Sequence, residues 1–99
     1  MAVTLTGSNP QISRQTISST NQALQVNMPS NVRKFSVQFI TNAGKVGFTG
    51  TDGSGLSAYV TIPADSIVQF EVDKGLDSIS AIFVESATAP TICEIVTEA

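Results

Sequence analysis

Polar and apolar side chains alternate along most of the chain, most clearly in residues 34–39 (KFSVQF). A period of two residues is typical of a strand with one buried face. The sequence TNAG at residues 41–44 supplies turn residues that tolerate positive φ, and Val46 and Phe48 then resume the alternation. We interpret residues 34–48 as a β-hairpin at the centre of an all-β domain. Its apolar side chains should lie in the core: Phe35, Val37, Phe39, Val46 and Phe48.

Further segments have the length and composition of short strands, and Gly, Pro, Asn or Asp separates them. No segment longer than a turn shows a helical period. This spacing predicts an all-β fold of about eight strands, either an antiparallel β-sandwich of jelly-roll type or a small barrel. The further strands are expected at residues 2–6, 11–19, 23–28, 57–62, 66–72, 78–85 and 91–98.

A length of 99 residues indicates one domain. We expect residues 1–10 to form an N-terminal arm or an edge strand, and residues 11–99 to form a single β-sandwich domain. Residues 82–84 (IFV) are apolar in sequence, as in an interior strand that is covered on both faces. Residues 50–55 (GTDGSG) contain three glycines, which predicts a mobile connection or a contact loop that becomes ordered against a partner.

The single cysteine, Cys93, lies in the alternating run of residues 91–95 and cannot form an internal disulfide. We expect it to be a small, buried strand residue. The fold should then be stable without disulfides, as in a protein made in a reducing cytosol.

Charge is sparse and unevenly divided. Charged residues make up 13% of the chain, against roughly 25% in typical globular domains. Residues 1–50 contain four basic residues and no acid, whereas residues 51–99 contain eight acids and one lysine. Strands from the two halves can pair within one sheet, so that opposite charges meet across strands. Alternatively, the positive side of one molecule meets the negative side of a neighbour in an assembly.

The composition argues against chemistry at a site. The chain has no histidine, which removes the usual general base and most transition-metal sites. No partner that would activate Cys93 as a nucleophile is recognisable, and residues 52–55 match a calcium loop only superficially. We therefore expect a protein that is not an enzyme and that binds no cofactor or metal.

Two classes of partner are also disfavoured. The net charge is −3, and no aromatic residues interleave with the few basic ones, so we expect no nucleic-acid binding. Residues 1–10 lack the basic start and apolar core of a secretory leader, and no run approaches the roughly 18 apolar residues of a membrane span.

Five motifs in order resemble small all-β structural proteins of tailed bacteriophage virions, and together they cover about residues 35–98. Residues 1–34 show no match of this kind. The motifs are F-x-V-x-F at residues 35–39, N-A-G-K at 42–45, G-F-T-G-T-D-G at 47–53, T-I-P-A-D at 61–65 and S-A-T-A-x-T at 86–91.

The resemblance implies a non-enzymatic virion protein, most simply a capsid decoration or cement protein. Such a protein is made in the host cytoplasm, binds the outside of the shell and bridges major capsid protein subunits, often as a dimer or trimer. A neck, tail or baseplate component is the nearest alternative. We expect contacts from the arm, the basic residues and the glycine loop: Val3, Leu5, Arg14, Arg33, Lys34, Thr51, Asp52 and Ser54.

A different class of function is a β-sandwich module that binds carbohydrate or a cell-surface ligand. Uncharged polar surfaces are common in such modules as well. The interpretation requires an exposed aromatic ring beside polar loop residues, and Tyr59 near residues 50–55 is the candidate.

Overall fold

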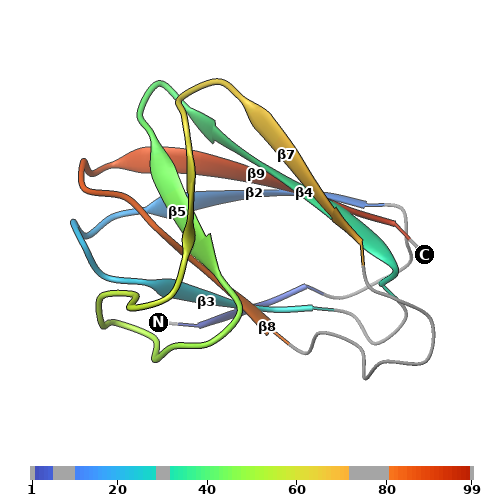
Figure 1. The fold of residues 1–99 in the computed structure, drawn as a ribbon, viewed down its shortest axis with the longest axis horizontal. Helices are drawn as coiled ribbons and strands as arrows, with labels where there is room; N and C mark the ends of the chain where they lie inside the picture. The colour runs from blue at the N-terminus through green and yellow to red at the C-terminus, as the bar shows by residue number, and fades with distance from the viewer. Residues whose placement is uncertain (1, 6–10, 29–31, 72–80, 99) are drawn as a thin grey trace.

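The computed structural model describes residues 2–5, 11–28, 32–71 and 81–98, and in these residues it contains strands and no helix (Figure 1). Two sheets pack face to face, which confirms the predicted antiparallel β-sandwich. The strands are Val3–Thr4 (β1), Gln11–Ile17 (β2), Leu24–Asn27 (β3), Lys34–Ile40 (β4), Gly44–Gly47 (β5), Val60–Ile62 (β6), Ile67–Glu71 (β7), Ala81–Glu85 (β8) and Thr91–Glu98 (β9).

The strand order is that of a jelly roll. The five-stranded sheet has the order β1-β3-β8-β5-β6 and the four-stranded sheet the order β2-β9-β4-β7. Four antiparallel pairs connect the first strands of the chain with the last in nested order: β2–β9, β3–β8, β4–β7 and β5–β6. Two further antiparallel pairs, β4–β9 and β5–β8, join these pairs into the two sheets. This is the double-sheet arrangement of jelly-roll folds. β1 adds to the edge by pairing in parallel with β3, so residues 3–4 form an edge strand.

The predicted hairpin at residues 34–48 is wrong, because β4 and β5 lie in different sheets. The chain turns between the layers at Thr41, whose φ is 76°. The Thr41 N–H donates to Asp65 Oδ1 at 3.1 Å, and the Asp65 N–H donates to the Phe39 carbonyl at 2.7 Å. Asp65 belongs to the connection between β6 and β7, which also passes from one sheet to the other. These two hydrogen bonds therefore fix the turn at Thr41 to a second connection between the sheets. A side chain at Gly44 would overlap the ring of Phe39, so the crossing also needs a glycine there.

The core between the sheets contains most of the expected side chains. Phe35, Val37 and Phe39 are fully buried, as predicted, and Cys93 is buried beside them. Phe48 is the exception, because it follows the end of β5 and is 47% exposed. Its ring meets those of Phe35 and Phe70 edge-on, with centroids 6.3 and 5.5 Å apart, so it caps the core instead of filling it.

The long connection from β5 to β6 covers the outer side of β8. Phe83 packs there with Ala23 and Leu56 in a second small cluster, which explains why residues 82–84 are apolar on both faces. The buried carboxylate of Glu85 accepts the Leu56 N–H at 2.5 Å. The connection between β5 and β6 is therefore part of the packed structure.

The glycine-rich segment expected to be a mobile connection is tied to β3 and the residue before it. Gly53 N–H donates to the Ala23 carbonyl at 2.8 Å, and Ala23 N–H donates to the Ser54 carbonyl at 2.9 Å. The Gln25 N–H donates to Asp52 Oδ1 at 2.9 Å. These bonds give the edge of β3 partners where β1 does not extend.

The contact between Phe39 and Gly44 generates a prediction about stability. Phe39→Ala should lower the free energy of unfolding by about 3–5 kcal/mol, because it empties a fully buried site. Gly44→Ala should cost about 1–3 kcal/mol through overlap with the ring. In a Phe39→Leu background the cost of Gly44→Ala should fall. Urea unfolding of the double-mutant cycle measures this coupling, and strictly additive effects would contradict it.

The tie between Glu85 and Leu56 generates a second prediction. Glu85→Ala should lower the free energy of unfolding by about 1–3 kcal/mol, because it leaves the Leu56 N–H without its acceptor. Glu85→Gln keeps an acceptor oxygen and is the matched control. Limited proteolysis should cut Glu85→Ala faster than the control between residues 48 and 59. Equal cleavage of both variants would show that the carboxylate does not hold this connection.

Candidate functional site

The four-stranded sheet turns one side away from the core, and we call this side the outer face. It consists of the even-numbered residues of β2, β4 and β9 together with Ile67, Gln69 and Glu71 of β7. Two large apolar side chains stand out on it: Ile12 is 76% exposed and Ile67 is 65% exposed. Exposed apolar side chains grouped on one surface are typical of contact sites.

The strand register places these isoleucines on either side of a hollow. One row across the sheet contains Ile12, Val96 and Ser36, and the next contains Glu94, Gln38 and Ile67. These six residues line a depression of about 180 Å³. The outer face therefore offers a concave, mostly uncharged surface between two apolar projections.

Opposite charges meet across the strands of this sheet. Arg14 Nε lies 3.5 Å from Glu94 Oε2, and Lys34 Nζ lies 3.7 Å from Glu71 Oε1. The basic half and the acidic half of the chain thus pair within one sheet, which is the first of the two explanations of their unequal charge. Exposed pairs of this kind contribute only about 0–1 kcal/mol to stability. Their main effect is to leave the outer face without a strong field of either sign.

The basic residues expected to act as a group do not form one patch. Arg14 and Lys34 project from the outer face, and Arg33 precedes β4, where its backbone N–H donates to the Glu98 carbonyl at 2.8 Å. Lys45 lies in the other sheet, and its Nζ is 4.4 Å from the centroid of the Tyr59 ring. One face of this ring is therefore in contact with a side chain of the same molecule.

The predicted contact residues of the arm are largely used within the fold. Leu5 is only 8% exposed, lies in the core and donates its N–H to the Asn27 carbonyl at 2.9 Å. Leu5 therefore presents little surface to a partner, and its contact with one stays a prediction. Val3 is half-buried and pairs with Val26.

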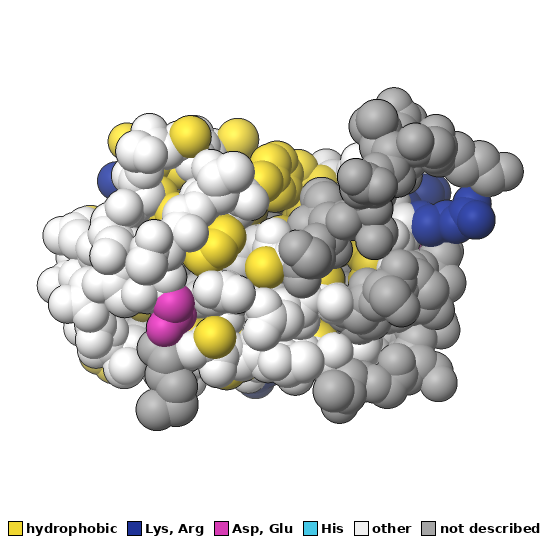
Figure 2. Space-filling view, turned by 90° about the horizontal axis from the view of Figure 1, so that it is seen from below, with side chains coloured by type: hydrophobic (Ala, Val, Ile, Leu, Met, Phe, Trp, Pro, Cys, Tyr) yellow, Lys and Arg dark blue, Asp and Glu magenta, His cyan; other side chains and the backbone are white. Residues whose placement is uncertain are grey.

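The predicted contact residues of the glycine loop lie beside the other sheet. Thr51 and Ser54 are exposed, whereas Asp52 is half-buried against β3. They lie apart from Arg14 and Lys34, which project from the four-stranded sheet. Seen from below, the molecule shows few charged side chains and a gathering of hydrophobic ones (Figure 2).

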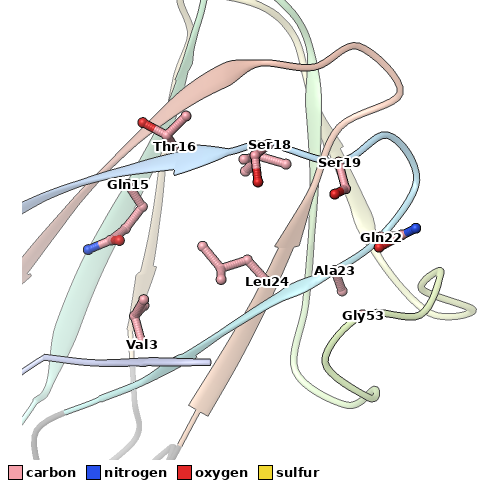
Figure 3. Close-up of a pocket in the computed structure, with 10 residues that line it drawn as sticks. Val3, Gln15, Thr16, Ser18, Ser19, Gln22, Ala23, Leu24 and Gly53 are labelled. Carbon is pink, nitrogen blue, oxygen red and sulfur yellow. The ribbon is translucent and has the colours of Figure 1, made fainter. Parts of the chain in front are cut away.

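A pocket of about 270 Å³ opens between the edge strand β2 and the start of β3. Figure 3 shows the side chains of Gln15, Leu24 and Val3 directed into this space from three strands. None of the described residues that line it is charged, and their polar groups are amides and hydroxyls. Its lining therefore holds no nucleophile paired with a base.

Chemistry is not apparent elsewhere in the described residues. They contain no group of three or more potential metal ligands, and they include no helix long and apolar enough to cross a membrane. Burial, together with the smaller effect of the nearby Glu94 charge, raises the pKa of the Cys93 thiol to about 12. This thiol is neutral at physiological pH and is a poor nucleophile.

Comparison of the chain with protein-family models, with curated proteins and with solved structures found no match.

The sequence interpretation did not select Ile12, Ile67 or Val96 for contacts. The alternation did indicate that Ile67 faces outward, because it is out of phase with the inward-facing Val68 and Phe70. Alternation alone could not separate this residue from an irregular strand end.

The raised pKa of Cys93 generates a prediction for alkaline pH. The folded protein keeps the thiol proton up to about pH 12, whereas the pKa of a thiol exposed to water is 9.0. The free energy of unfolding should therefore fall as pH rises from about 9 to 12, with up to about 1.4 kcal/mol per pH unit coming from this group. Urea unfolding of the protein and of Cys93→Ala measures this difference in slope, and equal slopes would contradict it.

Proposed function

We propose that the protein is a non-enzymatic structural component of a tailed-phage virion, of the capsid decoration or cement type. It binds the outside of the shell through the outer face and bridges major capsid protein subunits. The observation that carries the proposal is the pair of exposed isoleucines, Ile12 and Ile67, on either side of a hollow in the outer face. The sequence motifs supply the virion context.

The physical character of the outer face suits a permanent protein contact. Burial of exposed apolar side chains contributes about 25 cal/mol for each Å² removed from water. Ile12 and Ile67 project from neighbouring rows of a rigid sheet, so little conformational entropy is lost when a partner covers them. The charge of Glu94, which lines the hollow, is already paired with Arg14. A partner with a small apolar ridge and a polar rim is complementary to this surface.

A component of the neck, tail or baseplate would use the same surface. The number of copies of the protein in each virion distinguishes such a component from a decoration protein of the shell. A decoration protein is present in many copies for each shell, whereas a tail component is present in few. Quantitative mass spectrometry of purified virions against the major capsid protein measures this ratio.

Carbohydrate binding has less support from the geometry. Stacking of a sugar needs a free aromatic face, and the Lys45 ammonium lies over one face of Tyr59. A glycan array tests this alternative, and binding that is lost in Tyr59→Ala would favour it over the proposed contact.

The shell contact is tested by binding of the purified protein to shells that lack it. Ile12→Glu places a charge at the apolar projection and should weaken binding at least about tenfold. Thr61→Glu is the matched control, because Thr61 is an exposed strand residue of the other sheet. Co-sedimentation with shells measures both variants. Unchanged binding of folded Ile12→Glu would overturn the assignment of the outer face.

A further inference from the structure

β7 is an edge strand of unusual composition. It ends the order of the four-stranded sheet and pairs with β4 on one side, and among the described residues no strand pairs with its other side. An edge strand presents backbone N–H and C=O groups that can pair with another chain. Within the described part of the chain this edge is therefore unpaired, and its backbone groups can pair with a further strand.

Apolar side chains lie on both sides of β7. Ile67 is 65% exposed on the outer face, and Val68 and Phe70 are half-buried on the inner side against the core. The exposed ring of Phe48 meets Phe70 edge-on at 5.5 Å, which extends the apolar surface around the same edge.

The opposite edge of the same sheet differs in character. β2 carries polar residues at its inward positions Gln11, Ser13 and Gln15. Polar residues that point inward at an edge are a common protection against pairing with other chains. The inward residues of β7, Val68 and Phe70, are apolar, so β7 lacks this protection. Of the two edges of this sheet, β7 is therefore the one better suited to pair with another strand.

We propose that β7 pairs antiparallel with β7 of a second copy of the chain, across a two-fold axis at Gln69. The two four-stranded sheets then join into one continuous sheet of eight strands. In this register Gln69 faces Gln69 of the second copy, Val68 faces Phe70 and Ile67 faces Glu71. A second copy is the occupant because the strand is complementary to itself in this arrangement.

The complementarity is apolar, and the arrangement keeps the like charges of the two copies apart. Val68 and Phe70 form two apolar cross-strand pairs on the inner side, one on each side of the axis. The two Glu71 carboxylates lie at opposite ends of the pair, about 14 Å apart along the strands, so they do not repel strongly. Lys34 already lies 3.7 Å from Glu71 within each copy and lowers the local negative charge.

The dimer goes beyond the proposed contact with the shell and does not depend on it. Its tests use the purified protein alone. A dimer that forms without binding shells would contradict only the proposed function, and a monomer that binds shells would contradict only the dimer.

Sedimentation equilibrium should show a dimer of the purified protein, and Ile67→Glu should weaken it at least about tenfold by placing a carboxylate opposite Glu71 of the second copy. Ile12→Glu is the matched control, because it changes an isoleucine that is also largely exposed, on the same face at the other edge. This control should leave the dimer unchanged. A monomeric native protein, or equal weakening by both variants, would overturn the proposal.

A charge exchange tests the register. Adding Glu71→Lys to Ile67→Glu places a lysine of each copy opposite the introduced glutamate of the other, so the dimer should return to at least about one third of its native affinity. Failure of this rescue, with both chains folded by circular dichroism, would overturn the register.

A cross-link tests the axis directly. Gln69→Cys places two thiols opposite each other at the two-fold axis, so mild oxidation should yield a covalent dimer. Gln38→Cys lies on the same face but on the interior strand β4, and it is the control. It should run as a monomer on a non-reducing denaturing gel. Cys93 is buried and adds no background. Equal cross-linking of both variants would overturn the proposal.

Discussion

The close approach of Gly44 to the ring of Phe39 is the contact on which the chain path depends. Phe39 fills the space between the sheets at the point where the chain passes from one layer to the other. Because Gly44 has no side chain, β5 can begin directly across from β4. If β5 paired beside β4, the strand order of both sheets would change, and β9 would lose the place it occupies next to β4.

The connection between β5 and β6 has a related structural role. Leu56 covers Phe83, and the Glu85 carboxylate binds the Leu56 N–H, so a segment outside the sheets buries the outer side of β8. The glycines of residues 50–55 let the chain lie close to β3 and β8. This segment is therefore held against the sheet and is not a free loop. Consequently the outer side of β8 is covered by its own chain, whereas the two most exposed large apolar side chains, Ile12 and Ile67, lie on the opposite sheet.

The functional inferences rest on this division of surfaces. The outer face carries two exposed isoleucines around a hollow, and β7 carries apolar residues on both sides of an edge. These features support contacts with other protein chains, one across the face and one along the edge. Most charges on the outer face are paired with one another, Arg14 with Glu94 and Lys34 with Glu71, so a partner meets little unpaired charge there.

The alternation of side chains was sufficient to locate the strands, to assign Phe35, Val37 and Phe39 to the core and to identify an all-β fold. It could not distinguish a hairpin from a crossing between sheets, because both arrangements bury the same face of residues 34–40 and of β5. The burial of Leu5, the anchoring of residues 50–55 and the exposure of Ile12 and Ile67 were likewise decided only when the sheets came together. Local periodicity specifies which side of a strand is apolar, whereas the neighbour that covers that side comes from a distant part of the chain.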